Sequence, residues 1–372
     1  MLIGIDARVL ERTRTGISRY LMNLLNVWNN TQEDIKFILY FKDKIPTDLQ
    51  LNENVFETVL LKIPNFINKG LIWENLILPF RCMKDKIDIF FSPHYTLPLI
   101  KPANKLAVTI YDISYVAHPE WVPFRNRYIQ SFLSYIAAKR ANKIITGLQF
   151  GKSEISKYFN VKPESINVVY AAAHEKFKPG ITTDRINQLK NKYNLKNKVI
   201  LSIGLVMNRR QQDIIIKSIK TLSQDRKDIS FVLIGENRTF PYMDIDKLIL
   251  DLNLNNVVKY IPYLPEEEIV DIYNLADLYV YISLYEGEGL PLREAMACGL
   301  PAVISPIFKE VTGNAGYIVN TPIDANNLAT SINKMLDDST LRQSIIAEGL
   351  KRNSLFSWEK CAQETLNVFK SI

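Results

Sequence analysis

Short apolar runs alternate with amphipathic segments along almost the whole chain. Buried strands are predicted in the first half for the apolar runs at 2–7, 36–40, 87–91, 106–110, 143–145 and 166–170. Helices are expected between them at 17–28, 124–140 and 151–159. This alternation is typical of a parallel sheet with helices on both faces.

A second alternating series follows. It predicts strands at 199–203, 230–234, 257–260, 278–282 and 302–304, with helices at 212–222, 266–274, 291–297 and 325–337. The stretch near 171–195 has no strong periodicity, contains Pro179-Gly180 and many charges, and is interpreted as a linker. The pattern therefore predicts an α/β protein of two Rossmann-like, doubly wound domains at 1–180 and 181–355.

The stretch Tyr285–Pro301 combines a glycine-rich acidic loop with a helix. Gly287 and Gly289 allow a close backbone approach or a positive φ, and Pro291 suits the first helical position. The free N–H groups at such a helix start favour an anion such as phosphate. Glu286 and Glu294 flank this site and would repel phosphate unless they point away and bind hydroxyl groups. A phosphate held between hydroxyl groups describes a nucleotide sugar.

Other interpretations of the two glutamates are open. Glutamates eight residues apart are common by chance, and Glu294, placed in the first turn, would also complement the helix dipole. Paired carboxylates additionally suit hydrolytic acid–base chemistry. The glycine-rich context of Glu286 favours a binding platform.

Arg209 and Arg210 follow the strand predicted at 199–203, where a diphosphate would lie beyond the end of the sheet. Guanidinium groups bind phosphate in a bidentate way, whereas the alternative is a solvated basic turn. Gly16 opens the first helix and permits backbone approach to a phosphate, although an ordinary turn glycine would look the same. A full G-x-G-x-x-G is absent, so no dinucleotide site is predicted.

Three residues of the first half follow apolar runs and could contact an acceptor. Asp112 follows the run at 106–110, and His94 and His118 lie in loops, where a histidine is more often incidental. The helix at 124–140 carries aromatic residues near helical spacing beside basic ones. A core stripe with a charged flank is the expected explanation, and an interfacial membrane helix is the alternative.

Length and composition narrow the class of protein to which the chain can belong. The chain has 372 residues, 47% hydrophobic and 23% charged, as in a soluble protein of two domains. No apolar run is long enough to cross a membrane, and the N-terminus does not resemble a signal peptide. Three cysteines fit a reducing cytosol, and three histidines without a Cys-x-x-Cys make a zinc site unexpected.

The net charge of +7 comes from residues 1–180, which carry +8, whereas the rest of the chain carries −1. It is explained either by an ordinary soluble surface or by contact with an anionic membrane. Nucleic acid is not an expected partner, because no basic run interleaved with aromatic residues is present.

Together these motifs resemble the retaining glycosyltransferases of family 4, which have the two-domain GT-B fold. Glu286 and Glu294 match the two glutamates of the family's E-x7-E region, and the residues at 295–301 are very similar. Arg209-Arg210 occupies the place of its Arg-Lys pair. Further similarity covers nearly the whole chain, at Thr15-Gly16-Ile17, at Glu310 to Gly316, and at Phe356-Ser357-Trp358. The last resembles the start of the terminal helix, at 356–372, that packs back on the first domain.

The resemblance implies transfer of a sugar from a nucleotide sugar to an acceptor hydroxyl, with retained configuration and without a metal or other cofactor. Glu294 would bind the ribose and Glu286 the sugar hydroxyls. Backbone amides of Gly287, Glu288, Gly289 and Leu290, with Gly16 on the donor side, would support sugar and phosphates. Arg209 and Arg210 would neutralise the departing diphosphate. We expect Asp112 to act in catalysis with these arginines and Glu286.

Several positions depart from the family pattern. Tyr111-Asp112 replaces the usual His-Asp, Glu288 replaces a common aromatic residue, Arg210 replaces lysine, and Ala171-Ala172 stands where Asn-Gly is frequent. The donor side therefore resembles the family fully, and the acceptor side is altered.

The sequence predicts a cytoplasmic hexosyltransferase, peripheral at the inner face of the cell membrane, that acts in polysaccharide or lipopolysaccharide assembly. GDP-mannose is the expected donor, and a glycan or lipid-linked glycan is the expected acceptor. The alternatives are a catalytically silent scaffold of the same fold, or an enzyme that isomerises or hydrolyses its nucleotide sugar.

Overall fold

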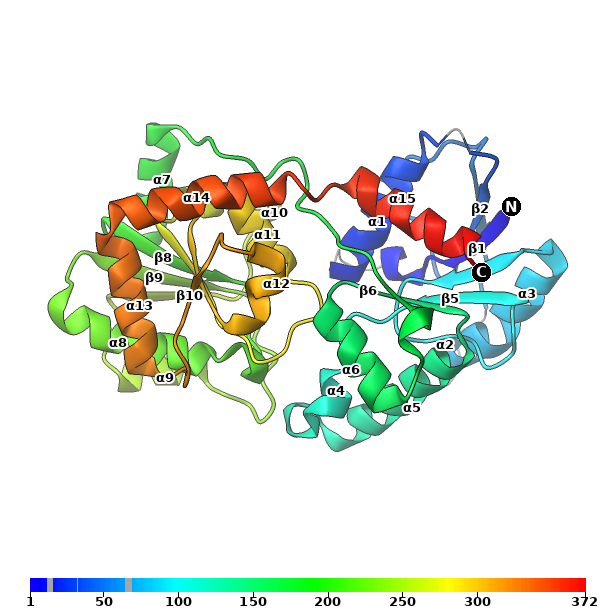
Figure 1. Ribbon diagram of the computed structural model, residues 1–372, viewed down its shortest axis with the longest axis horizontal. Coiled ribbons are helices and arrows are strands. Elements are labelled where there is room, and N and C mark those ends of the chain that lie inside the picture. The colour runs from blue at the N-terminus through cyan, green and yellow to red at the C-terminus, as the bar shows by residue number, and fades with distance from the viewer. Residues whose placement is uncertain (12–15, 32, 64–68) are drawn as a thin grey trace. The chain divides into compact units, whose positions relative to one another are not determined.

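The chain divides into two compact units in the computed structural model, which describes residues 1–11, 16–31, 33–63 and 69–372 (Figure 1). The first unit comprises residues 1–119, 124–171 and 357–372, and the second comprises 120–123 and 172–356. Each unit has a parallel sheet with helices on both of its faces. The predicted two-sheet α/β architecture is thus confirmed.

In the first unit, the described residues form a seven-stranded sheet of order β3-β2-β1-β4-β5-β6-β7. Its strands are β1 (Leu2–Asp6), β2 (Lys36–Phe41), β3 (Phe56–Leu60), β4 (Ile89–Ser92), β5 (Lys105–Thr109), β6 (Lys143–Thr146) and β7 (Ile166–Val168). The helical elements are η1 (Arg8–Glu11), α1 (Gly16–Trp28), α2 (Lys69–Ile72), η2 (Trp73–Ile77), α3 (Leu78–Asp85), α4 (Ser114–Ala117), η3 (Pro119–Trp121), α5 (Phe124–Arg140), α6 (Gln149–Phe159), η4 (Pro163–Ser165) and α15 (Trp358–Lys370).

The second unit is built on a six-stranded sheet of order β10-β9-β8-β11-β12-β13. Its strands are β8 (Lys198–Ile203), β9 (Ile229–Ile234), β10 (Val258–Ile261), β11 (Leu278–Tyr281), β12 (Ala302–Ile304) and β13 (Tyr317–Ile318). The helical elements are α7 (Thr183–Tyr193), η5 (Asn208–Arg210), α8 (Gln212–Asp225), α9 (Ile245–Asp251), α10 (Glu266–Leu275), α11 (Leu290–Ala297), η6 (Pro306–Phe308), α12 (Lys309–Thr312), α13 (Ala325–Asp337) and α14 (Ser339–Asn353).

Each sheet has a point where the strand order reverses. In the first unit this switch point lies between β1 and β4, and in the second it lies between β8 and β11. The connections that leave the two strands at a switch point diverge to opposite sides, which opens a crevice beyond the strands' carboxyl ends. Ligands of open α/β sheets bind at such crevices.

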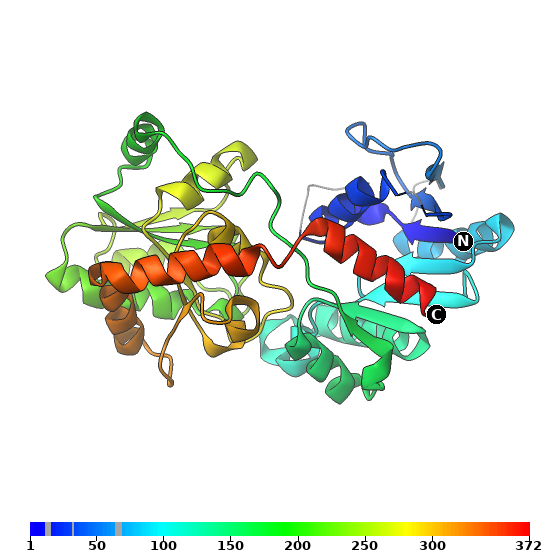
Figure 2. The same cartoon turned by 45° about the horizontal axis from the view of Figure 1, so that its top comes forward.

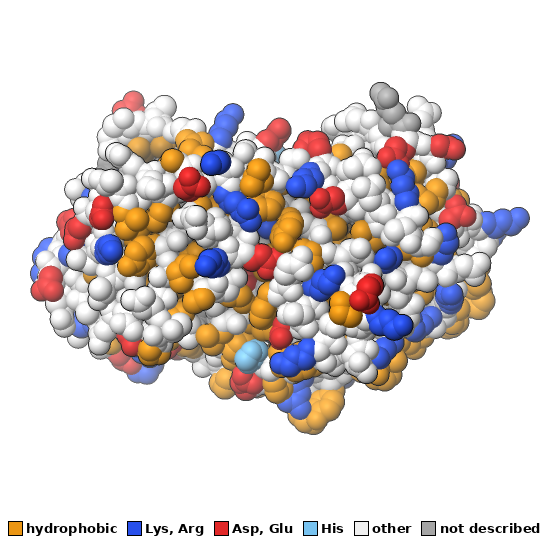
Figure 3. Space-filling view, viewed as in Figure 1, with side chains coloured by type: hydrophobic (Ala, Val, Ile, Leu, Met, Phe, Trp, Pro, Cys, Tyr) orange, Lys and Arg blue, Asp and Glu red, His pale blue; other side chains and the backbone are white. Residues whose placement is uncertain are grey.

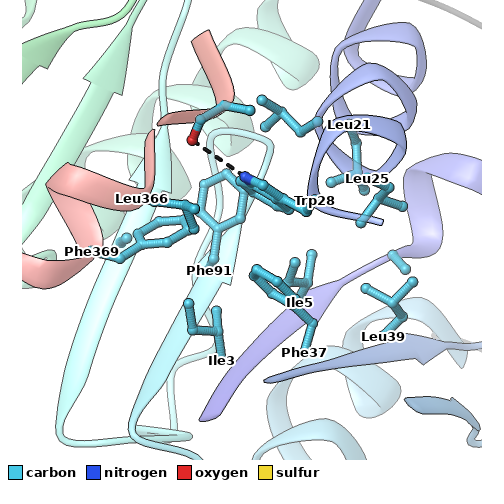
Figure 4. Packing of buried hydrophobic residues seen from close by; sticks show 14 of the residues in the cluster. Ile3, Ile5, Leu21, Leu25, Trp28, Phe37, Leu39, Phe91, Leu366 and Phe369 are labelled. Atoms are coloured by element: carbon cyan, nitrogen blue, oxygen red, sulfur yellow. Dashed lines mark hydrogen bonds between the residues drawn. The ribbon is translucent and has the colours of Figure 1, made fainter. Parts of the chain in front are cut away.

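The C-terminal helix α15 completes the core of the first unit and lies beside α1 (Figure 2). Its residues Leu366 and Phe369 pack among side chains of β1, β2 and α1 (Figure 4). The Trp28 indole, on α1, donates a hydrogen bond to the Ala362 carbonyl oxygen at 3.2 Å. The Phe369 ring lies 5.0 Å from that of Phe91 on β4. The chain's last helix therefore stabilises the unit in which the chain begins.

The linker interpretation of residues 171–195 is wrong in its second part. Helix α7 occupies Thr183–Tyr193, and the Thr182 side chain accepts from the Arg185 N–H at its start. Leu189 is the buried residue of this helix. The sequence shows little periodicity there because a helix with so narrow a buried face needs few apolar residues.

The core interpretation of the aromatic residues on α5 is also wrong. The fully buried residues of the helix are small, namely Ser134, Ala137 and Ala138, and its aromatic residues are exposed. Phe124 is 69% exposed and Phe132 is 61% exposed, and the other exposed large residues of α5 are Tyr128, Ile129 and Tyr135. Small residues permit close approach to the sheet, so the aromatic residues take the opposite face.

Removing the Phe369 ring tests the role of α15 in the first unit. We expect Phe369→Ala to lower the free energy of unfolding by about 3–5 kcal/mol, because a buried aromatic side chain leaves a cavity. Chemical denaturation followed by circular dichroism would measure the loss. Asn367→Ala, on the exposed side of the same helix, is the matched control and should change stability by less than about 0.5 kcal/mol. Equal effects of both substitutions would contradict the packing described.

Candidate functional site

The candidate site lies at the switch point of the second unit. Strands β8 and β11 are neighbours, and their carboxyl ends lead into η5 and into the loop at 282–289. The Arg209 carbonyl oxygen accepts from the Leu284 N–H at 2.8 Å and from the Ser283 hydroxyl at 3.3 Å. These bonds tie the two segments together, so the predicted basic pair and the predicted acidic loop form one site.

Glu286 is buried and receives hydrogen bonds on one carboxylate oxygen. Its Oε2 accepts from Arg210 Nη2 at 3.2 Å, from Arg210 Nε at 3.3 Å and from the Tyr281 hydroxyl at 2.9 Å. Its Oε1 has no hydrogen-bond partner within the described part of the chain. One oxygen therefore anchors the side chain, and the other is available to a ligand hydroxyl.

Arg210 is buried and stays charged because acceptors surround it. Burial by itself lowers the pKa of its guanidinium, but Tyr281 and Glu286 raise that pKa above the ordinary value overall. Its Nη1 also donates to the Leu205 carbonyl oxygen at 3.2 Å. The sequence contained no sign of Tyr281 as a partner, since the residue reads as one more apolar position of β11.

Gly204 provides the space that Arg210 occupies. It has φ of +124°, and a Cβ atom built on it would lie 2.2 Å from Arg210 Nη1. A larger residue would therefore combine backbone strain with displacement of the guanidinium. Glycine at this position is explained by the arginine beside it.

The glycine loop leads into α11 through Gly289, which has φ of +77°. The helix begins at Leu290, one residue before the predicted start, and Pro291 lies in its first turn. Leu292 and Arg293 donate their N–H groups to the Gly289 carbonyl oxygen. The N–H groups of Gly287, Gly289 and Leu290 donate to none of the described residues, so they are available to a phosphate or sugar oxygen.

Glu294 lies beyond the first turn of α11, which contains no acidic residue. The suggestion that it complements the helix dipole from the first turn is therefore wrong. The Tyr273 hydroxyl, from α10, donates to Glu294 Oε2 at 3.0 Å. Burial, together with the charge of Glu294, raises the pKa of Tyr273 well above its usual value, so this hydroxyl keeps the proton that it donates.

Glu288, the third carboxylate of the loop, is paired within its own segment. Its Oε1 lies 3.6 Å from Arg293 Nε, and Arg293 is fully buried. The Arg293 guanidinium also lies over the Phe356 ring, 4.0 Å from its centroid. Sequence reasoning missed Arg293, whose place on a helix next to Glu294 gave no sign that it points inward.

Asp112 and Gly16 belong to the first unit. Asp112 Oδ1 accepts from the Ser114 N–H at 2.6 Å, just before α4. Gly16 is the first residue of α1, and a Cβ atom built on it would meet no atom within 4 Å. The preceding Thr13, Arg14 and Thr15, part of the same motif, lie outside the described residues.

No group of three or more His, Cys, Asp or Glu in the described ranges is arranged to hold a metal ion. Cys82, Cys298 and Cys361 are buried, and none of them forms a disulfide within the described residues.

Comparison with known proteins agrees with this geometry. Residues 184–352 match the family model described as glycosyl transferases group 1. Over 370 residues the chain is 29% identical to O-antigen chain mannosyltransferase B of Escherichia coli, covering 96% of each protein. These findings support a glycosyltransferase.

Solved structures agree on the fold. HepE of Anabaena, in complex with UDP and glucose, has a TM-score of 0.76 at 17% identity and covers 100% of this chain and 99% of its own. WaaG, a glycosyltransferase involved in lipopolysaccharide biosynthesis, has a TM-score of 0.72 at 15% identity and covers 98% of both chains. The fold of the chain is GT-B, as the sequence predicted.

Gly204→Ala tests whether glycine is needed to seat Arg210. We expect this variant to bind GDP at least about tenfold more weakly, measured by calorimetry, because the new methyl group displaces the guanidinium. Backbone strain should also cost about 1–3 kcal/mol of stability. Gly180→Ala is the matched control, since Gly180 has a similar φ of +130° but open space around it. It should lose similar stability and keep GDP affinity. If both variants bind GDP as the unaltered protein does, Gly204 has no part in the site.

Proposed function

We propose that the chain is a retaining, metal-independent mannosyltransferase that transfers mannose from GDP-mannose to a glycan or lipid-linked glycan during polysaccharide or lipopolysaccharide biosynthesis. The observation that carries the proposal is the Arg210–Glu286 pair at the β8/β11 switch point. It places a buried positive charge, for a diphosphate, beside a carboxylate oxygen suited to a sugar hydroxyl.

The relatives support the choice of donor and pathway. The similarity to O-antigen chain mannosyltransferase B extends over 96% of both proteins and therefore includes both units. That protein's name concerns mannose and an O-antigen chain. The Arg210–Glu286 geometry suits any nucleoside diphosphate sugar, so the sugar and the base are inferred from the relatives.

Each residue of the site has a role in this proposal. The free N–H groups of Gly287, Gly289 and Leu290 hold the phosphates or the sugar. Glu286 Oε1 accepts from a hydroxyl of the donor sugar, and Glu294 binds the ribose. Arg209 and Arg210 stabilise the negative charge that develops on the leaving diphosphate, which is the main electrostatic demand of the reaction. Asp112 of the first unit is assigned to the acceptor side.

Glu286 is better suited to binding than to acid catalysis. Three donor atoms of Arg210 and Tyr281 converge on its Oε2 and hold the carboxylate in one orientation. A carboxylate held in this way suits a group that positions a ligand hydroxyl through its other oxygen. This supports a transferase over a glycosidase-like hydrolase.

The outer face of α5 supports peripheral contact with an anionic membrane. Its aromatic residues are exposed, and Arg127 lies over the rings of Phe124 and Tyr128, at 5.3 and 4.7 Å from their centroids. Hydrophobic and basic side chains gather along the lower edge of the first unit in Figure 3, where Figure 1 places α5. Such a face buries rings at the headgroup level and attracts acidic lipids. Among the described residues, no helix is long and apolar enough to cross a membrane.

Substituting Glu286 tests the donor site. The unaltered protein should release GDP from GDP-mannose in a panel of GDP-, UDP- and dTDP-sugars followed by mass spectrometry. Glu286→Gln should lower kcat by about 10²–10³ without unfolding the protein, because a transition-state contact is lost. The exposed Glu267→Gln on α10 is the control and should keep full activity. Activity in excess EDTA should be unchanged.

Several outcomes of this panel would count against the proposal. If no donor is bound or consumed, the transferase proposal fails. If a donor is bound but not consumed, the chain is a catalytically silent scaffold. If a donor is hydrolysed or isomerised and every glycan acceptor is ignored, the alternative enzyme classes hold. Full activity of Glu286→Gln would remove this residue from the site.

The membrane contact has its own test. Phe124→Ser combined with Phe132→Ser should reduce co-sedimentation with vesicles that contain anionic phosphatidylglycerol, and binding of the unaltered protein should weaken as salt rises. Leu250→Ser combined with Tyr263→Ser removes two exposed apolar residues from the second unit and is the matched control. Equal binding by all three proteins, or binding that ignores salt, would contradict the role of α5.

A further inference from the structure

Another arginine of the second unit is buried next to the glycine loop. Arg293 lies on α11, four residues after Gly289, and its side chain is 0% exposed. An arginine keeps its charge in proteins, and burying that charge is costly unless nearby groups stabilise it. The groups around Arg293 therefore indicate which part of the structure it holds.

The acidic neighbour of Arg293 is Glu288, in the glycine loop. Glu288 Oε1 lies 3.6 Å from Arg293 Nε, and both side chains are buried. At this separation the contact is an ion pair rather than a hydrogen bond. The Arg293 N–H also donates to the Gly289 carbonyl oxygen at 3.2 Å. Arg293 thus contacts the loop through its side chain and through its backbone.

Glu288 stands at the position where the loop most needs an anchor. It lies between Gly287 and Gly289, whose backbones are the least restricted because they have no side chain. On the other side of Gly287, Glu286 is held by Arg210. Two carboxylates two residues apart are therefore held by two different arginines. Gly287, whose N–H is assigned to the donor, lies between the two anchored residues.

An aromatic ring completes the surroundings of Arg293. Arg293 Cζ lies 4.0 Å from the centroid of the Phe356 ring, and Arg352 Cζ lies 5.2 Å from the same centroid. Arg352 is held in turn, because it donates to the Glu310 and Val311 carbonyl oxygens at 2.9 and 3.0 Å. A guanidinium gains most from an aromatic ring where water is excluded. Helices α11 and α14, which carry the two arginines, pack against each other (Figure 1).

We propose that Arg293 is a positioning residue of the donor site. Through Glu288 it holds the glycine loop in one conformation before the donor binds, so binding does not have to order the loop. The proposal rests on the proposed function, because only a donor site gives the loop its ligand. An arginine with a merely structural role would stabilise the unit and leave the mobility of the loop unchanged.

NMR measures the mobility of the loop without any ligand. Labelling glutamate with ¹³C at the carbonyl carbon and glycine with ¹⁵N selects the N–H groups of glycines that follow a glutamate. The chain has three of these glycines, namely Gly287, Gly289 and Gly349. Gly349 lies inside α14 and is the internal reference. In the unaltered full chain all three should have order parameters of about 0.85, as in rigid backbone.

Arg293→Met should release the loop. The order parameters of Gly287 and Gly289 should fall below about 0.6, and that of Gly349 should not change. Order parameters of the two loop glycines that stay at the level of the unaltered protein would overturn the proposal.

GDP affinity measures the consequence for the donor site. In calorimetry well below Tm, Arg293→Met should bind GDP about tenfold more weakly, because binding must then order the loop. Arg293→Lys keeps the charge and loses the planar contact with Phe356, so its affinity should be intermediate. If Arg293→Met does not fold, Arg293→Lys carries the same comparison.

Arg342→Met is the matched control for lost stability. Arg342, near the start of α14, donates to the Met335 carbonyl oxygen at 2.8 Å. Its loss should lower Tm and leave GDP affinity and loop order unchanged. A GDP affinity that falls equally in Arg342→Met and Arg293→Met would show a general effect of stability and would overturn the positioning role.

A double substitution tests whether Arg293 acts through Glu288. Glu288→Met combined with Arg293→Met replaces both charges by apolar side chains, a change that is often neutral when the partners are removed together. This protein should bind GDP more tightly than Arg293→Met alone, since no buried carboxylate is left without its counter-charge. Fold-changes that simply multiply would show that the two residues act independently, against the proposal. If the unaltered protein binds no nucleotide sugar, the proposed function fails, whereas the order parameters still decide whether Arg293 holds the loop.

Discussion

The pairing of Arg210 with Glu286 is the constraint on which the second unit depends. Two buried charges are costly unless each finds close partners, and here Tyr281, the Leu205 carbonyl oxygen and the opposite charge supply them. The pair joins the segments that leave β8 and β11, which are adjacent in the sheet and far apart along the chain. Removing either partner would leave the other charge buried without its counter-charge. The conformation of the site therefore depends on the balance between these two charges.

The first unit repeats this arrangement with different charge. Each switch point contains an arginine held by carboxylate oxygens: Arg210 by Glu286, in the loop after β11, and the partly exposed Arg8 by Asp6 on β1 and Glu74 on η2. Arg210 is balanced by one glutamate, and it lies beside Arg209 and the N–H groups of the glycine loop, which suits an incoming diphosphate. Arg8 meets two carboxylates, Asp6 and Glu74. The two switch points therefore differ in the number of acids that hold the arginine.

Side-chain size decides which face of α5 is buried and which is exposed. Ser134, Ala137 and Ala138 bring the helix close to its unit, and the aromatic residues are left on the outside with Arg127 above two of the rings. Helix α15 shows the opposite case, since its large residues Leu366 and Phe369 enter a gap among β1, β4 and α1. Burial of an aromatic residue is therefore decided by the space that its neighbours leave.

The alternation of apolar runs and amphipathic segments was enough to predict two parallel sheets, because strand and helix periods are local properties of the chain. The glycine loop before Pro291 and the Arg209-Arg210 pair were also recognisable, since residue type and spacing carry their chemistry. Tertiary structure alone decided which groups meet: Arg210 with Glu286 across 76 residues, Gly204 under that arginine, and Arg293 with Glu288. It likewise turned the aromatic face of α5 outward. These outcomes depend on packing between distant segments, which no local period encodes.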